Sequence, residues 1–140
     1  MLLGEYDHQI DEKSRMFLPA KMREECGGVV YVVRGVDKCI AVYPEKEWMA
    51  FAEKLQALPQ IKAREIRRKL LPTAERTTVD SHGRILLPQR LREYASLEDR
   101  NVKVLGVGDY AELWNPELLA GHESTVGDEE MIADLIELGF

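Results

Sequence analysis

The chain has 140 residues, with 19 basic and 25 acidic side chains and a formal net charge of −6 at pH 7. This length predicts one small domain, or two very small units that share a core. No apolar run approaches the ~20 residues that cross a bilayer. Acidic residues at positions 5, 7, 11 and 12 are not typical of a secretion signal, so we expect a cytoplasmic protein.

The acidic excess is concentrated at one end of the chain. Residues 121–140 contain six acidic side chains and no Lys or Arg, which leaves residues 1–120 neutral. Because phosphate binding requires Lys and Arg, the net charge taken alone argues against nucleic acid. The distribution of charge removes most of that argument, because the excess of acidic residues lies in the C-terminal segment, residues 121–140.

Residue types that carry catalysis or bind metals show no recognisable spacing. The two cysteines, Cys26 and Cys39, and the three separated histidines match no metal-site pattern. The chain also lacks a P-loop, a GxGxxG segment and a GxSxG segment. We therefore expect neither an enzyme nor a bound metal or cofactor.

The first 28 residues predict a strand, a turn, a strand and a short helix. Alternation over residues 6–10 favours a strand. The Asp-x-x-x-Arg segment at 11–15 predicts a turn, because an Asp side chain accepts hydrogen bonds from backbone amides two residues on. Residues 15–18 follow as a return strand. Pro19 suits the first helical position, and glycines 27 and 28 end that helix.

Two strands and two helices are predicted next. Apolar segments at 29–33 and 39–43 predict a strand pair, and helical spacing covers residues 45–58 and 61–71. The second helix has a basic face, whose arginines are Arg64, Arg67 and Arg68. This face either contacts phosphate or is a solvated surface that pairs with acids of a neighbour.

The first unit recurs 69 residues later, with six identities in fourteen aligned positions and no gap. The identical pairs are Asp11/Asp80, Arg15/Arg84, Leu18/Leu87, Pro19/Pro88, Arg23/Arg92 and Glu24/Glu93. The second copy therefore predicts the same elements, followed by strands at 102–107 and 111–114. Ser14 stands where the second turn has Gly83, which tolerates positive φ. Neither copy is large enough to bury a core alone, so we expect the two to complete each other.

These observations divide the chain into four parts. Residues 1–58 form a first unit, 59–76 a helical connector, 77–120 a second unit, and 121–140 an acidic tail with one helix. Asp128 stands at the start of that helix, and its apolar stripe consists of Met131, Ile132, Leu135 and Ile136.

The duplicated Asp-x-x-x-Arg-x-x-x-Pro-x-x-x-Arg pattern resembles the MraZ family of bacterial transcriptional regulators. The start Met1–Tyr6 and the segments 34–44 and 107–114 add to a likeness that covers residues 1–120 in order. It implies a mainly β fold with short helices (α+β), in which tandem SpoVT-AbrB-like swapped-hairpin units form a double-split β-barrel. It further implies rings of about eight or more subunits, which bind direct repeats in double-stranded promoter DNA.

The resemblance also implies which residues act and where. The DNA-contacting arginines fall on Arg15 and Arg84, with Lys13 beside the first, while Asp11, Asp80 and Gly83 orient the loops. The target is the cell-division and cell-wall gene cluster, which the family represses or tunes, so the protein is expected at the nucleoid.

Two alternatives remain open at this point. The Asp–Arg pairs can be ion pairs that only stabilise a turn. The chain can also be an antitoxin-like interaction module that binds a protein partner through its apolar-striped acidic tail.

Overall fold

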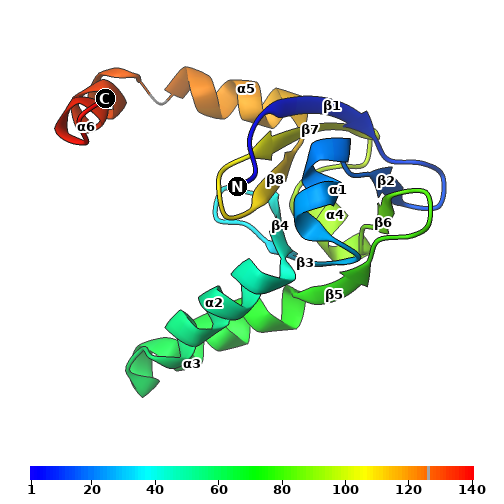
Figure 1. The fold of residues 1–140 in the computed structure, drawn as a ribbon, viewed down its shortest axis with the longest axis horizontal. Helices are drawn as coiled ribbons and strands as arrows, with labels where there is room; N and C mark the ends of the chain where they lie inside the picture. The colour runs from blue at the N-terminus through cyan, green and yellow to red at the C-terminus, as the bar shows by residue number, and fades with distance from the viewer. Residues whose placement is uncertain (126) are drawn as a thin grey trace.

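The computed structural model describes residues 1–125 and 127–140 and has a mixed α+β fold (Figure 1). Its strands are β1 (Glu5–Gln9), β2 (Arg15–Phe17), β3 (Val29–Arg34), β4 (Ile40–Pro44), β5 (Glu75–Thr78), β6 (Arg84–Leu86), β7 (Asn101–Gly106) and β8 (Ala111–Trp114). Its helices are α1 (Ala20–Cys26), α2 (Glu45–Gln56), α3 (Gln60–Leu70), α4 (Gln89–Tyr94), α5 (Pro116–Thr125) and α6 (Glu129–Glu137), with a 3-10 turn, η1 (Leu71–Thr73).

The two copies of the repeat interlock through their strands. β1 of the first copy pairs with β7 of the second, and β5 of the second pairs with β3 of the first. The two registers are equivalent, since Gln9 faces Asn101 and Thr78 faces Val29. The expectation that the copies complete each other is therefore confirmed at the level of backbone pairing.

The return strands β2 and β6 form a separate two-stranded sheet, here called the β2–β6 ribbon. Met16 faces Ile85 at its centre. Arg15 faces Leu86 on one side of this pair, and Phe17 faces Arg84 on the other. Because Arg15 and Arg84 are equivalent in the repeat, a pseudo-two-fold axis passes between Met16 and Ile85.

Both copies contribute to one apolar core. Met16 and Ile85 are fully buried, and Met22 of α1 and Leu91 of α4 lie in the same cluster. Strand residues such as Val32 and Val104 complete it. A shared core of this kind gives two short units the buried apolar area that neither could provide alone.

The strand pairing confirms the α+β class but does not show a closed double-split barrel. The larger sheet has the order β1-β7-β8-β4-β3-β5, so β1 and β5 are its edges. Within the described residues, β2 and β6 pair only with each other. The sheet therefore remains open at both edges.

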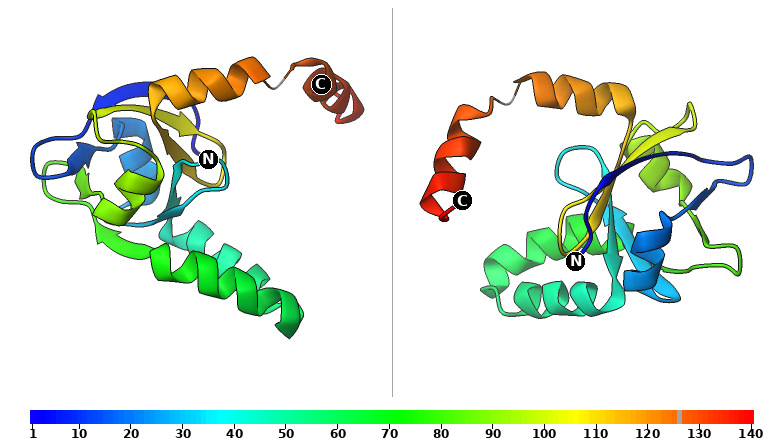
Figure 2. Two further views of the ribbon diagram at one scale, coloured as in Figure 1. Left: turned by 180° about the vertical axis from the view of Figure 1, so that it is seen from behind. Right: turned by 45° about the horizontal axis from the view of Figure 1, so that its top comes forward.

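Helices α2 and α3 form an antiparallel pair that projects away from the sheet, on the other side of the molecule from the β2–β6 ribbon (Figures 1 and 2). Helix α3 lies in the predicted connector, residues 59–76, whereas α2 lies in the predicted first unit. The pair is anchored by Trp48 of α2, whose ring stacks on Tyr31 of β3 at a centroid distance of 5.4 Å. Ala63 of α3 is fully buried, and Pro59 separates the two helices.

Prolines 19 and 88 precede their helices instead of occupying the first helical position. Pro19 has ψ 137° and Pro88 has ψ 143°, which is extended backbone, and α1 and α4 begin one residue later. The helix over the predicted tail is α6, which buries no residue. Helix α5 begins before residue 121 and packs through Leu119 against Cys39 and Trp114. None of the helices in the described part of the chain is long and apolar enough to cross a membrane.

Candidate nucleic-acid interface

Asp11 organises the first turn, here called loop 11–15. Its Oδ1 atom accepts hydrogen bonds from the backbone nitrogens of Lys13 and Arg15, each at 2.9 Å. Its Oδ2 atom accepts a hydrogen bond from Arg15 Nε, also at 2.9 Å. One carboxylate therefore fixes both the backbone of the turn and the direction of the arginine side chain.

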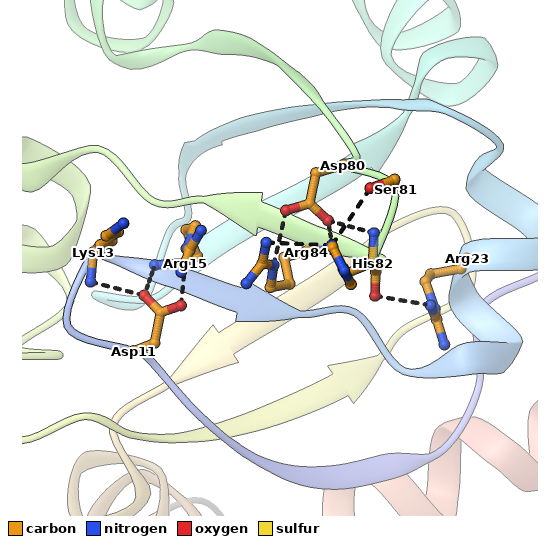
Figure 3. A network of polar contacts seen from close by, with 8 residues as sticks. All are labelled: Asp11, Lys13, Arg15, Arg23, Asp80, Ser81, His82 and Arg84. Carbon is orange, nitrogen blue, oxygen red and sulfur yellow. Dashed lines mark hydrogen bonds and ion pairs between the residues drawn. The ribbon is translucent and has the colours of Figure 1, made fainter.

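Loop 80–84 repeats this arrangement. Asp80 Oδ1 accepts hydrogen bonds from the backbone nitrogens of His82 and Arg84, each at 2.9 Å, and Oδ2 accepts one from Arg84 Nε at 2.8 Å. Figure 3 shows the two loops beside the ribbon strands that they precede. Two equivalent arginines are thus held in the same manner at pseudo-symmetric positions.

Each turn requires one residue in the left-handed region of backbone space. Gly83 has φ 84°, as expected for glycine, and Ser14 at the equivalent position has φ 62°. The backbone nitrogens of both residues donate to the carbonyl of the preceding Asp. Ser14 therefore carries a backbone strain that Gly83 avoids, at a cost of about 1–2 kcal/mol.

Hydrogen bonding keeps both carboxylates ionised. The backbone hydrogen bond from Arg84 is the main cause that lowers the pKa of Asp80 to about 2. The equivalent bond from Arg15 lowers the pKa of Asp11. Donors that bind the charged form of a carboxyl group stabilise that form. At neutral pH each arginine consequently stands beside a fixed negative charge.

The terminal guanidinium nitrogens remain available to a ligand. The Arg15 side chain is 30% exposed and that of Arg84 is 21% exposed. In the described structure the hydrogen bond of Arg15 to Asp11 uses Nε, and no other group bonds its Nη atoms. Arg84 Nη2 lies 3.5 Å from His82 Nδ1. Each loop can therefore present a planar pair of donors whose direction is set in advance.

Arg23 is a further residue at this site that the sequence did not single out. Its Nη1 atom donates to the carbonyl of His82 at 3.4 Å, so a residue of the first unit contacts the loop of the second (Figure 3). Its counterpart in the repeat, Arg92, instead donates from Nε to the carbonyl of Leu87 at 3.0 Å. The only signal in the sequence that could have pointed to Arg23 and Arg92 is that both are arginines, separated by the fixed offset of the repeat.

The structure does not bring every predicted residue together. Lys13 lies exposed on loop 11–15, next to Arg15. The three arginines of α3 lie on the connector, which all three views place away from the loops (Figures 1 and 2). Arg68 forms an ion pair with Glu65 of its own helix at 3.3 Å. No group of three or more His, Cys, Asp or Glu within residues 1–125 and 127–140 could hold a metal ion.

These features define a class of protein: a duplicated chain with interlocked units and two Asp-held arginines on pseudo-symmetric turns. The family model described as "MraZ protein, putative antitoxin-like" matches residues 1–69 and 70–130. The chain therefore belongs to the MraZ family, which confirms the resemblance found in the sequence.

Individual relatives agree with this assignment. Proteins named "Transcriptional regulator MraZ" include one from Carboxydothermus hydrogenoformans, 45% identical over 120 residues that cover 84% of this chain and 83% of the relative. One from Syntrophomonas wolfei is 40% identical and covers 99% of both chains. One from Heliobacterium modesticaldum is 44% identical over 119 residues, 84% of this chain and 82% of the relative.

Proposed function

We propose that this protein is a sequence-specific regulator of transcription that binds double-stranded DNA through loops 11–15 and 80–84. The observation that carries the proposal is the pair of equivalent arginines, each held by a carboxylate through Nε. Within the described residues nothing bonds the Nη atoms of Arg15, and Arg84 Nη2 has one contact, with His82 Nδ1 at 3.5 Å. The names of the relatives, which describe transcriptional regulators, support it.

The chemistry of an oriented guanidinium favours this reading over a purely structural ion pair. Two parallel N–H groups match the O6 and N7 acceptors of guanine in the major groove, and such a pair discriminates by about 1–3 kcal/mol. A two-stranded ribbon also fits the width of that groove. Holding Arg15 and Arg84 in place before binding reduces the entropy lost when DNA is bound.

Bulk charge contributes little to binding, because residues 1–120 are neutral. Affinity must then come from the number of loops that bind at once. We propose that the protein assembles into a ring of about eight or more subunits on direct repeats in promoter DNA. Simultaneous binding by several linked subunits raises affinity by about 100–10,000-fold over binding by one subunit. Lys13 is a proposed phosphate contact, because it lies exposed beside Arg15. For Arg64, Arg67 and Arg68 we propose the alternative role of a solvated basic face, because α3 lies away from the loops.

The resemblance to the family implies which genes such a regulator would act on. We propose that the regulated promoter lies upstream of the cell-division and cell-wall gene cluster and that binding represses it. The protein would then act in the cytoplasm, at the nucleoid.

Band shifts with the promoter region, repeated over a salt series, test the proposal. The double variant Arg15→Ala/Arg84→Ala should lose sequence-specific binding, whereas Lys13→Ala should reduce binding to all sequences about equally and lower the salt slope. Unchanged affinity in the double variant would show that the loops do not read DNA. Light scattering tests the ring separately, and a monomer at micromolar concentration would contradict it.

A second candidate function rests on helix α6. Its apolar residues Met131, Ile132 and Ile136 are each at least half exposed, and its other face is acidic. Such a helix can bind a groove on another protein. The family description includes the words "antitoxin-like", which is consistent with this second function. A stoichiometric small protein that copurifies with the full chain, and is lost on deleting residues 127–140, would support it.

A further inference from the structure

The outer face of the β2–β6 ribbon carries two large apolar side chains beside the two arginines. Phe17 is 49% exposed and Leu86 is 55% exposed, whereas their neighbours Met16 and Ile85 point into the core. Side chains alternate between the two faces of a strand. Phe17 therefore shares the outer face with Arg15, and Leu86 shares it with Arg84.

The register arranges these four side chains in two rows. Arg15 lies opposite Leu86 and Phe17 lies opposite Arg84. Each arginine is drawn toward its own loop by the hydrogen bond from Nε to Asp11 or Asp80. In this register Arg15 and Arg84 occupy one diagonal of the face, and Phe17 and Leu86 occupy the other diagonal.

A contact between Arg84 of β6 and Phe17 of β2 orders this face. The guanidinium carbon of Arg84 lies 5.9 Å from the centre of the Phe17 ring, within the range of a cation–π interaction. Phe17 thus supports the arginine opposite it while keeping half of its surface exposed. Each oriented cation thus lies opposite an apolar side chain, which matches a ligand surface that has an apolar group adjacent to hydrogen-bond acceptors.

We propose that Phe17 and Leu86 contact the 5-methyl groups of thymines adjacent to the guanines bound by Arg84 and Arg15, respectively. In the major groove, thymine is the base that presents a methyl group, and apolar side chains recognise it by contact. This inference rests on the proposed DNA-binding function and adds a second base preference to it. Phe17 and Leu86 are then specificity-determining residues, and the recognised sequence contains thymine adjacent to its guanine contacts.

The two apolar side chains differ although their positions are equivalent. The pseudo-two-fold axis relates Phe17 to Leu86, but phenylalanine offers the larger contact area. The thymine beneath Phe17 should therefore contribute more to binding than the one beneath Leu86. Burying one methyl group changes affinity about fourfold.

The experiment removes single methyl groups from the DNA instead of from the protein. The unaltered full chain first selects its tightest duplexes from a random-sequence pool. Each thymine of the selected site is then replaced by deoxyuridine, which lacks the 5-methyl group but keeps every hydrogen-bonding atom. Affinities are measured for the unaltered chain and for Phe17→Ala and Leu86→Ala. Met49→Ala is the matched control, because Met49 is 48% exposed but lies on α2.

The expected result is a loss of about fourfold for the unaltered chain at one or two thymines adjacent to the guanines. Phe17→Ala should bind more weakly and no longer respond to deoxyuridine at one of these positions, while Met49→Ala should respond like the unaltered chain. Leu86→Ala should lose the smaller of the two deoxyuridine effects, the one at the thymine that Leu86 contacts.

Three results would overturn the inference: a selected site with no thymine adjacent to the guanines, equal affinity for thymine and deoxyuridine, or an undiminished deoxyuridine effect in both alanine variants. The first two need no variant, so a folding defect cannot hide them. If Arg15→Ala and Arg84→Ala abolish binding while deoxyuridine is neutral, only this inference fails. If the full chain selects no duplex at all, the DNA-binding function itself fails.

Discussion

The side chain of Arg23 occupies the space beside Gly83 that a Cβ atom would fill. A Cβ atom built there would lie 2.7 Å from Arg23 Cδ and would overlap its guanidinium. The equivalent position of the first loop is Ser14, which has a Cβ atom, and Arg92 instead donates to the carbonyl of Leu87. The two loops share their internal hydrogen bonds but differ in how they pack against the body of the protein.

Gly83→Ala should destabilise the protein by more than the backbone strain alone. The substitution places a Cβ at φ 84°, which costs about 1–2 kcal/mol, and it also displaces Arg23. Gly108→Ala is the matched control, because Gly108 has φ 96° but open space where its Cβ would be. Urea unfolding of both variants measures the difference. Equal losses would show that the contact with Arg23 contributes nothing.

Ser14→Gly should have the opposite effect in the first loop. It relieves the strain of φ 62°, and this gain is partly offset by the extra freedom of glycine in the unfolded chain. We expect the free energy of unfolding to rise by up to about 1 kcal/mol. Chemical denaturation tests the sign, and a clear loss of stability would show that the Ser14 side chain makes a stabilising contact that outweighs the strain.

Asp80 should make the stability of the protein depend on pH in the acid range. Its pKa in the folded protein is about 2, below the ordinary value of 3.8, because backbone and side-chain donors of Arg84 bind the carboxylate. The stabilisation is therefore fully present above about pH 4 and is lost as the pH falls toward 2. Asp80→Asn should flatten the curve of unfolding free energy against pH in this interval.

Asp99→Asn controls for the loss of one negative charge, because Asp99 is exposed and outside the loops. It should leave the slope between pH 4 and 2 nearly unchanged. If Asp80→Asn and Asp99→Asn gave the same curve, the hydrogen bonds of loop 80–84 would not be the source of the pH dependence.

Trp48→Ala should remove the main contact that packs α2 against the sheet. Trp48 stacks on Tyr31 and makes edge contact with Tyr43 at 5.6 Å, so it joins α2 to β3 and β4. Truncation of a buried tryptophan costs about 3–5 kcal/mol. Thermal unfolding measures the loss, and Met49→Ala, on the exposed side of the same helix, should change the stability little. Equal effects would contradict the role of Trp48 as the anchor.

The sequence alone determined the local features of this protein. The repeat at a fixed offset predicted two equivalent turns, and both have the predicted Asp–Arg geometry. The predicted strands and helices also lie within a few residues of their expected positions, whereas α5 (Pro116–Thr125) was not predicted. These features follow from residues that are close in the chain, because a turn of five residues is decided by its own hydrogen bonds and backbone preferences.

Only the tertiary structure decided how these pieces combine. The pairing of β1 with β7 and of β5 with β3, the open sheet, and the contact of Arg23 with loop 80–84 all join residues far apart in the chain. An alternating strand pattern states which face is buried but not which strand lies beside it. The choice of partner depends on how the whole chain buries its apolar surface. For the same reason, the placement of Phe17 and Leu86 opposite the two arginines on one outer face became visible only once β2 and β6 were paired.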